Sequence, residues 1–288
     1  MQISKKEKHS MKKTLLLTVL RNVAKQIPPT AGIVLALTIL NLKANAQEVN
    51  LGTANNYGVL AGSAVTSTGS TVINGGLGLT PGSSVTGAPV VHGLYDVDDA
   101  AAIQAQNDLI IAYNQAAGLA SSGTLTGTIG TLTLTPGVYT FSSSAVLTGQ
   151  LTLNDEGNPD AVFVFQIGSS LTAEVGSSVV TINDPSSSTA GMSVFWQVTS
   201  SATLQTDVPF EGNILALTSI TADTGATDLD GRLLAMNGAV TLDDNTITAP
   251  PAEAQDTSVP DTGSTPLLLG ASLAALFAFG RRFSALLR

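Results

Sequence analysis

The sequence contains no cysteine and few of the other residues that usually perform chemistry. The missing thiols exclude disulfide bridges, thiolate nucleophiles and cysteine-ligated metal sites. Between residues 44 and 280 the chain has no lysine and one histidine, His92. The usual pairs of nucleophile and base need a second histidine, a cysteine or a lysine, so they cannot be assembled there. We interpret His92 as a structural residue at a turn.

Positive charge is also missing from most of the chain. Of the 12 lysines and arginines, eight lie at or before Lys43 and three at or after Arg281. Between Gln47 and Pro250, 17 acidic side chains accompany a single arginine, Arg232, which gives a formal charge of −16. Because such a surface repels a phosphate backbone, nucleic-acid binding is excluded. The hydrophobic content of 43% is enough to build a core.

The first 46 residues have the three parts of a secretory signal peptide. A basic opening is followed by an apolar run, Ala31 to Leu40, and then by the small-x-small sequence Ala44-Asn45-Ala46. We therefore expect export, with cleavage before Gln47 and a start at Met1 or Met11. A permanent membrane anchor is the alternative, although the apolar run is short for a span.

Residues 259–288 are predicted to be a second address, joined by a linker over residues 251–258. They combine the motif VPDTG, starting at Val259, with an apolar stretch from Pro266 to Phe279 and the pair Arg281-Arg282. This layout resembles the PEP-CTERM sorting signals, in particular their VPDSG variant, with threonine in place of serine. The resemblance implies transient membrane insertion and processing by an exosortase-like peptidase. A plain C-terminal transmembrane helix is the alternative.

Residues 47–250 are expected to form one mainly β domain. Brief alternation of apolar and polar residues, interrupted by glycine and proline, is typical of many short strands. Residues 98–120 differ, because their apolar residues recur with helical spacing and predict one amphipathic helix. The helical positions are Ile103, Ile110, Tyr113 and Ala117. Capping is the expected role of the acids before it, with a calcium site as the alternative: Asp96, Asp98 and Asp99.

Four later segments can be superimposed on one another: SLTAE from Ser170, SATLQ from Ser201, SITAD from Ser219 and AVTLD from Ala239. Successive side chains of a strand point to opposite faces, so the second and fourth positions, all apolar, are predicted to face a core. The inward set is Leu171, Ala173, Ala202, Leu204, Ile220, Ala222, Val240 and Leu242. The outward ranks are Ser170, Ser201, Ser219 and Ala239; Thr172, Thr203, Thr221 and Thr241; and Glu174, Gln205, Asp223 and Asp243.

The threonines of the middle rank are separated by 31, 18 and 20 residues. Repeats of this kind, with one short strand per face, predict a β-solenoid with irregular coils. A β-sandwich is the alternative fold. In stacked strands, neighbours lie about 4.7–4.9 Å apart and alternate residues of one strand about 6.5–7 Å apart. A rigid lattice of methyls and hydroxyls at those spacings can order water, and its natural ligand is ice.

The sequence also holds two copies of a tetrapeptide typical of aspartic proteases, starting at Asp223 and at Asp261. Such an enzyme needs two buried aspartates that share a proton. The strand alignment places Asp223 in an outward rank, and Asp261 lies in the predicted sorting segment. We therefore expect no protease. A glycan-cleaving enzyme is a further alternative, for which hydrolysis needs paired carboxylates and Arg232 is the one basic group available to a lyase.

Stretches between Asn50 and Thr248 indicate a family. They are NLGTANNYGVLAGSAVTSTGSTVINGGLGLTPGSSVTG, DDAAAIQAQNDLIIAYNQAAG, LTPGVYTFSSSAVLTGQLTLNDEGNPDAVFVFQIGSSL, and the later SVFWQVTSSATL, GNILALTSITADTGAT and GRLLAMNGAVTLDDNTIT. Together they resemble the DUF3494 family of microbial ice-binding, or antifreeze, proteins. The resemblance implies an irregular right-handed β-solenoid of triangular cross-section, with one long α-helix packed alongside and a flat face that binds ice.

The resemblance also implies a T-G-x-T pattern near that face, which Thr224 to Thr227 and Thr68 to Thr71 fit. The candidate ice-binding residues are therefore Ser170, Thr172, Ser201, Thr203, Ser219, Thr221, Thr224, Thr227, Ala239, Thr241, Thr66, Thr68 and Thr71. Charged or bulky residues in the third rank, with Asp207 and Pro209 nearby, narrow the flat area. We therefore expect inhibition of ice recrystallisation rather than strong freezing-point depression.

The sequence thus predicts an exported ice-binding protein without catalytic activity, cofactor or metal. Its partners are the surface of ice and, at the C-terminal signal, the sorting peptidase. We expect it to be secreted or associated with the cell surface or outer membrane of a Gram-negative-type bacterium. The alternative from another class is an adhesin or matrix protein that binds polysaccharide through the same fold; its aromatic platform would have to include Trp196, which lies in an apolar segment.

Overall fold

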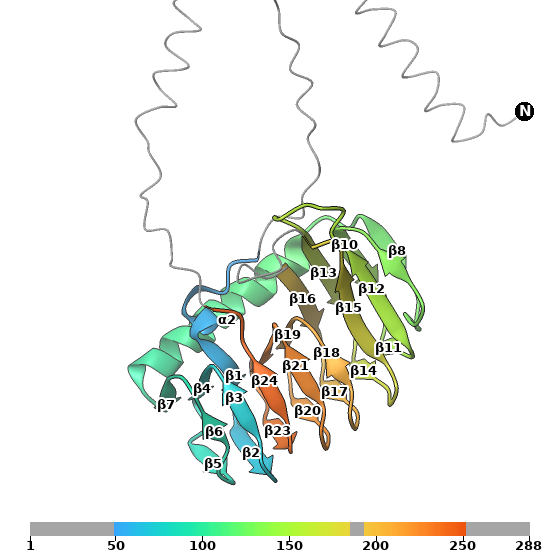
Figure 1. Cartoon of the computed structure of the whole chain (residues 1–288). Coiled ribbons are helices and arrows are strands. Elements are labelled where there is room, and N and C mark those ends of the chain that lie inside the picture. The colour runs from blue at the N-terminus through green and yellow to red at the C-terminus, as the bar shows by residue number, and fades with distance from the viewer. Residues whose placement is uncertain (1–48, 185–192, 252–288) are drawn as a thin grey trace, which may run out of the picture. The chain divides into compact units, whose positions relative to one another are not determined.

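A computed structural model describes residues 49–184 and 193–251 of the chain (Figure 1). The predicted signal peptide and the C-terminal sorting segment lie outside these ranges, as does the linker beyond residue 251. No helix in the described ranges is long and apolar enough to cross a membrane. The described residues are mainly β, with one α-helix, α2 (Ala100–Gly118), and a short 3-10 helix, η1 (Gly52–Asn56).

The strands form four sheets, named A to D here, and all of the pairings between strands are parallel. In spatial order, sheet A consists of β7 (Tyr95–Val97), β4 (Gly76–Leu79), β1 (Tyr57–Ala61), β22 (Arg232–Ala235), β19 (Asn213–Ala216), β16 (Ser193–Val198), β13 (Val162–Ile167), β10 (Gly137–Phe141) and β8 (Gly123–Leu125).

Sheet B consists of β11 (Ala145–Leu147), β14 (Leu171–Ala173), β17 (Ala202–Leu204), β20 (Ile220–Ala222), β23 (Val240–Asp243), β2 (Ala64–Thr68) and β5 (Ser84–Thr86). Sheet C consists of β18 (Pro209–Phe210), β21 (Thr227–Leu229), β24 (Thr246–Thr248), β3 (Val72–Asn74) and β6 (Val90–Val91). Sheet D consists of β15 (Ser178–Ile182), β12 (Gln150–Asn154) and β9 (Thr133–Leu134).

Over most of its length the chain visits sheet A, then sheet B, then sheet C or D, and returns to sheet A; one such circuit is called a coil below. From β7 to β9 the order differs, because α2 follows β7, and β8 of sheet A leads to β9 of sheet D with a single bridge, Thr128 to Val146, at sheet B. The last coil, β22 to β24, pairs with the first, β1 to β3. The N-terminal coil therefore lies inside the stack, between the C-terminal coil and the coil that begins with β4 (Figure 1). An antiparallel β-sandwich, the alternative fold, is excluded because the neighbouring strands are parallel.

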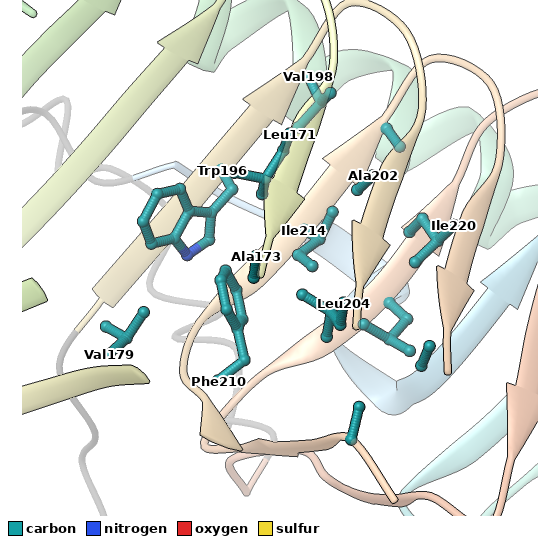
Figure 2. Packing of buried hydrophobic residues seen from close by; sticks show 14 of the residues in the cluster. Leu171, Ala173, Val179, Trp196, Val198, Ala202, Leu204, Phe210, Ile214 and Ile220 are labelled. Carbon is teal, nitrogen blue, oxygen red and sulfur yellow. The ribbon is translucent and has the colours of Figure 1, made fainter. Parts of the chain in front are cut away.

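The core fills the space enclosed by the sheets. All eight residues predicted to point inward from sheet B are at most 1% exposed. Figure 2 shows Leu171, Ala202 and Ile220, from three successive strands of sheet B, directed into the same interior as Trp196 and Phe210. Trp196 is fully buried, and its ring stacks on Phe165 with centroids 4.0 Å apart. The alternation of the sequence therefore identified the buried face correctly.

Helix α2 covers the outer surface of sheet A, so the central strands of this sheet are buried on both sides. Leu109 and Tyr113 of the helix pack with Leu60, Val164 and Leu215 of the sheet. The alanines beside them are also fully buried: Ala102, Ala105, Ala112 and Ala116. The small side chains let the helix approach the sheet closely. The buried strands of sheet A correspondingly read as continuous apolar runs such as VFVFQI.

Of the four residues whose spacing predicted the helix, the helix buries one. Tyr113 is buried, but Ile103 and Ile110 are 48% and 42% exposed, and Ala117 is exposed. Large apolar residues at helical spacing predict the helix, whereas close packing on a flat sheet selects the alanine side for burial. The helix start is confirmed, because Asp99 Oδ1 accepts a hydrogen bond from the Ala102 N–H at 2.9 Å.

The other two acids of the predicted cap have different partners. Asp96 Oδ2 accepts a hydrogen bond from the Tyr57 hydroxyl at 2.6 Å, and Asp98 Oδ1 lies 3.5 Å from the Thr80 hydroxyl. At the other end of the helix, Gln166 of β13 donates to the carbonyls of Ala116 and Leu119. These contacts hold the helix on sheet A and leave sheets B, C and D as the faces without a helix.

Candidate functional site

The middle outward rank of sheet B is a row of threonines on adjacent strands. The register pairs Thr172 with Thr203, Thr203 with Thr221, and Thr221 with Thr241, as the superimposed segments predict. It continues from Thr241 to Thr66 of β2 and from Thr66 to Thr86 of β5. Six threonines thus follow one another across the sheet, over about 24 Å at the usual strand spacing. This row is called the Thr rank below.

Every member of the Thr rank is half-buried or exposed, while its sequence neighbours in the strands point into the core. Beyond Thr172 the row continues with Val146 of β11, which forms a bridge with Thr128. Thr86 and Val146 are missing from the sequence-based candidates. The signal for Thr86 was present, because Val85-Thr86 repeats the apolar-Thr pattern of Val65-Thr66. The coil order hid it, since strands adjacent in space lie far apart in the sequence.

The serine rank has a structural role at the edge of the sheet. Ser201 Oγ accepts a hydrogen bond from the Ser219 N–H, and Ser219 Oγ accepts one from the Ala239 N–H. Ser170 Oγ lies 3.0 Å from Ser144 Oγ, and Ser201 Oγ lies 2.7 Å from the Thr218 hydroxyl. These hydroxyls therefore connect neighbouring coils where the chain enters sheet B, and the residues are half-buried.

The two T-G-x-T segments do not occupy the same place in their coils. Thr68 pairs with Asp243, and Val72 pairs with Thr246, which pairs with Thr227. The segment that starts at Thr68 is therefore one residue out of phase with the segment that starts at Thr224.

This difference decides where the last threonine of each segment points. Thr71 is 1% exposed and accepts a hydrogen bond from the Asn245 N–H, so its selection as an ice-contacting residue was wrong. Thr227 is half-buried and belongs to sheet C rather than to the Thr rank.

The glycines of both segments are required by the turn from sheet B to sheet C. Gly69 and Gly225 have φ of +63° and +74°, in the left-handed region that L side chains rarely adopt. The space beside each is also filled, because a Cβ on Gly69 would collide with Asp244, and one on Gly225 with Asp207. Each glycine thus receives an aspartate from the neighbouring coil, so the coils stack closely at this edge.

Asp243 connects the same two segments through its side chain. Its Oδ1 accepts a hydrogen bond from the Thr68 hydroxyl at 2.6 Å, and its Oδ2 accepts one from the Thr224 hydroxyl. The hydroxyl donors lower the pKa of Asp243, since they stabilise its charged form. Thr68 and Thr224 are both exposed, so the pair extends the surface of the Thr rank towards the turn.

The outward positions of sheet C lack a comparable row. The residues aligned across it are Pro209, Thr227, Thr246, Val72 and Val90. On the same face, Leu229 is 46% exposed, and Asn74 bonds to His92 and to Thr248. His92 is exposed and contacts the Asn74 side chain at 2.8 Å, and its structural role stays a prediction. Sheet A is covered by the helix, and sheet C has no row of similar side chains. Of sheets A, B and C as described, sheet B is therefore the one that is both regular and uncovered.

Buried carboxylates lie at the edges where sheets C and D lead into sheet A, away from the Thr rank. Asp228 is fully buried and Asp155 is 1% exposed. Burial raises the pKa of both and of Glu211. Perturbed acids of this kind often mark catalytic sites, but a carboxylate this deeply enclosed is out of reach of a substrate. Asp223, the candidate protease residue, is a half-buried member of the third rank.

Asp155 predicts a measurable dependence of stability on pH. Burial, and then the charges of Asp184 and Glu211, raise its pKa from 3.8 to about 6. An acid whose pKa is raised in the folded state contributes its full stabilisation below the pKa that it has in the unfolded chain, here 3.8. This stabilisation is lost as the pH rises through the folded-state pKa of about 6. We expect Asp155→Asn to flatten the fall in unfolding free energy between about pH 4 and 6 by about 1–3 kcal/mol.

Chemical denaturation at a series of pH values measures this effect. Asp160→Asn is the matched control, because Asp160 lies in the same connection between β12 and β13 and is exposed. The control should leave the slope unchanged. Equal slopes for Asp155→Asn and the unmodified protein would contradict the expected role of Asp155.

Comparison with known proteins agrees with this geometry. The model of a family described as ice-binding-like matches residues 59–248. The chain belongs to this family. An ice-binding protein of Nostoc sp. (strain HG1) is 49% identical over 260 residues, which cover 87% of the chain and 94% of that relative. The ice-binding-like match includes the whole Thr rank, both T-G-x-T segments and the helix.

Solved structures of ice-binding proteins have the same fold. A crystal structure of an ice-binding protein from an Antarctic biological consortium is 44% identical, with a TM-score of 0.67, and the match covers 74% of the chain and 96% of that structure. Another, from the Antarctic ascomycete Antarctomyces psychrotrophicus, is 38% identical with a TM-score of 0.65, and the match covers 70% of the chain and 98% of that structure. The ice-binding-like fold therefore accounts for nearly all of the described residues.

Proposed function

We propose that this protein is an ice-binding protein that adsorbs to ice through the Thr rank of sheet B and has no catalytic activity. The observation that carries the proposal is the register of six threonines on adjacent parallel strands of a face that no helix covers. Family membership and the ice-binding relatives support it independently. Adsorption to ice inhibits its growth or recrystallisation.

The chemistry of the Thr rank suits a solid of ordered water. Each threonine offers one methyl and one hydroxyl, and the strand ladder repeats them about every 4.8 Å. The core beneath is fully packed, so the lattice stays rigid when the surrounding water fluctuates. Hydroxyls anchor water by hydrogen bonds while methyls enclose it, and water ordered in this way can merge with an ice surface.

The proposed architecture is an irregular right-handed β-solenoid of triangular cross-section, with α2 packed alongside. The recurring order of sheets A, B and C or D along the chain supports it, since the coils that begin with β1, β4, β10, β13, β16, β19 and β22 each contribute one strand to each side. In such a solenoid the strands of sheet B lie in one plane, so the Thr rank is flat. Flatness matters because a crystal face contacts all six residues only when they share a plane.

The proposed location is outside the cytoplasm. Cleavage of the signal peptide before Gln47 would export the domain, and the C-terminal signal would insert transiently into the membrane until an exosortase-like peptidase processes it. The product would be secreted or held at the cell surface or outer membrane of a Gram-negative-type bacterium. The location suits the function, because ice forms outside the cell. The domain has no cysteine, so its folding there does not depend on disulfide formation.

We do not propose the polysaccharide-binding alternative, because the structure offers it no aromatic platform. Trp196 is fully buried between Phe165 and Phe210. Tyr95, which is 56% exposed, is the one largely exposed aromatic side chain of the described ranges, and it lies on β7 at the end of sheet A. Sugar-binding surfaces use several aromatic rings that stack on the sugar faces.

The test is whether the exported protein, expressed from the full-length chain, changes the growth of ice. We expect micromolar protein to shape single ice crystals and to slow recrystallisation in a frozen sucrose solution. Strong freezing-point depression is not expected, since acidic residues of the third rank border the Thr rank. A heat-denatured sample is the control. Crystals that grow unshaped and coarsen at the buffer rate would refute the proposal.

A further inference from the structure

Asp243 lies at the centre of a hydrogen-bonded group that spans three coils of sheet B. Its strand, β23, is placed between β20 and β2. The carboxylate accepts a hydrogen bond from Thr224, which follows β20, and another from Thr68, at the end of β2. Its own N–H donates to Asn245 Oδ1 at 2.6 Å, which holds the backbone in place. One side chain therefore restrains an exposed threonine on each side of it.

These bonds fix how the two threonines face the solvent. An ionised carboxylate only accepts hydrogen bonds, so both hydroxyls donate to Asp243. The Thr68 hydroxyl also lies 3.4 Å from the Leu242 carbonyl, but its 2.6 Å bond to Asp243 is much the shorter. The free lone pairs of Thr68 and Thr224 then remain for water, which must donate to them. Since the oxygens are held, the χ1 angles are set and each methyl takes one position. The hydroxyl of a solvated threonine without such a partner rotates among several directions. This rotation is lost only on binding, which costs conformational entropy.

We propose that Asp243 is a positioning residue of the ice-binding face, which fixes the rotamers and hydroxyl directions of Thr68 and Thr224 before ice is encountered. The inference rests on the proposed function of sheet B. It changes the role of the third rank, which by charge alone would only interrupt the lattice. Asp243 itself need not touch ice, because it acts through the two threonines.

Asp223 provides a comparison within the same rank. It lies one coil away on the same face, is half-buried like Asp243, and also precedes the turn to sheet C. Its hydrogen bonds run through the backbone, since Asn245 Nδ2 and the Ala226 N–H both donate to its carbonyl. Replacing the two aspartates in turn removes the same charge from the same rank, but only one replacement releases the threonines.

The first arm of the experiment measures inhibition of ice recrystallisation by the exported protein and its variants. We expect Asp243→Ala to lower the activity about five- to tenfold, since two side chains must then be ordered on binding. The activity of Asp243→Asn should lie between those of Asp243→Ala and the unmodified protein, because the amide has one oxygen and can accept a hydrogen bond from one of the two hydroxyls. Asp223→Ala and Asp223→Asn should stay within about twofold of the unmodified protein. Equal losses at both positions would overturn the inference, because charge rather than positioning would then decide the activity.

The second arm does not depend on ice. Three-bond couplings measured by NMR report the χ1 rotamers of Thr68 and Thr224 in solution. We expect single rotamers in the unmodified protein and in Asp223→Ala, and averaged couplings in Asp243→Ala with an unchanged melting temperature. Rotamers that stay fixed without Asp243 would overturn the inference. If the unmodified protein has no activity on ice, the first arm rejects the proposed function, whereas the couplings still decide whether Asp243 positions the threonines.

Discussion

Thr221→Tyr is expected to reduce adsorption to ice by more than tenfold while the fold remains intact. Thr221 lies near the middle of the Thr rank, with Thr203 on one side and Thr241 on the other. A tyrosine ring there would stand above the plane of the neighbouring methyls and keep ice away from the residues on both sides. The side chain points outward, between the buried Ile220 and Ala222, so the core is not disturbed. Large aromatic residues are also well accepted in strands.

Thr246→Tyr is the matched control for this substitution. Thr246 lies on β24 of sheet C, is half-buried like Thr221, and pairs with another threonine, Thr227. The control should retain the activity and the melting temperature of the unmodified protein. Recrystallisation rates and ice-crystal shapes at equal protein concentration provide the measurement. Full activity of Thr221→Tyr would place the ice-binding surface elsewhere, and a loss confined to Thr246→Tyr would place it on sheet C.

The strand pattern of sheet B could be predicted because burial dictates it. Ile220 and Ala222 are buried while Thr221 is not, and a shift of one residue would reverse all three. The four superimposed segments share this constraint, so aligning them by their apolar positions also aligned their threonines. Thr66 was also a candidate, but its place next to Thr241 in the rank, and the extension to Thr86, were harder to find. Both depend on the last coil stacking against the first, and spacing along the chain carries no information about that contact.

The errors arose where packing overrode the simplest pattern. The spacing of Ile103 and Ile110 predicted helix α2 correctly but does not mark its buried side, because a flat sheet accepts the alanine side more closely. Thr71 was selected because its segment and the one that starts at Thr224 both fit the pattern T-G-x-T. The one-residue difference in phase, which buries Thr71, follows from the strand register, because the motif starts two residues after Thr66 but three residues after Thr221. Short motifs therefore predict a turn better than they predict which side chain is exposed.

Arg232→Met is expected to destabilise the protein by about 3–5 kcal/mol, the usual cost of removing one partner from a buried charged group. Arg232 is 2% exposed. Its Nε and Nη2 donate to the carbonyl of Asn55 at 3.1 and 2.9 Å, and Nη2 also donates to the carbonyl of Pro250. Its Nη1 donates to Asn213 Oδ1 at 2.9 Å. The single arginine between residues 44 and 280 thus joins the two ends of the described chain.

The stability lost in Arg232→Met has a second component, which comes from Asp228. This side chain is fully buried. Within the described ranges its carboxylate has no side-chain hydrogen-bond partner, and besides Arg232 the backbone N–H of Gly212 is the group that favours its charged form. Burial raises the pKa of Asp228, and the positive charge of Arg232 opposes that rise. Without the arginine, Asp228 must take up a proton or remain as an uncompensated charge in the core. The destabilisation by Arg232→Met should therefore increase as the pH rises.

A double-mutant cycle separates the two components. Asp228→Asn removes the buried charge, so adding it to Arg232→Met should recover part of the lost stability and remove its dependence on pH. The remaining loss measures the bonds to Asn55, Asn213 and Pro250, which the second substitution does not restore. Reversible denaturation in urea gives the four free energies of unfolding. A cost below about 1 kcal/mol for Arg232→Met would show that packing alone holds the two ends together, since a net hydrogen bond contributes about that much.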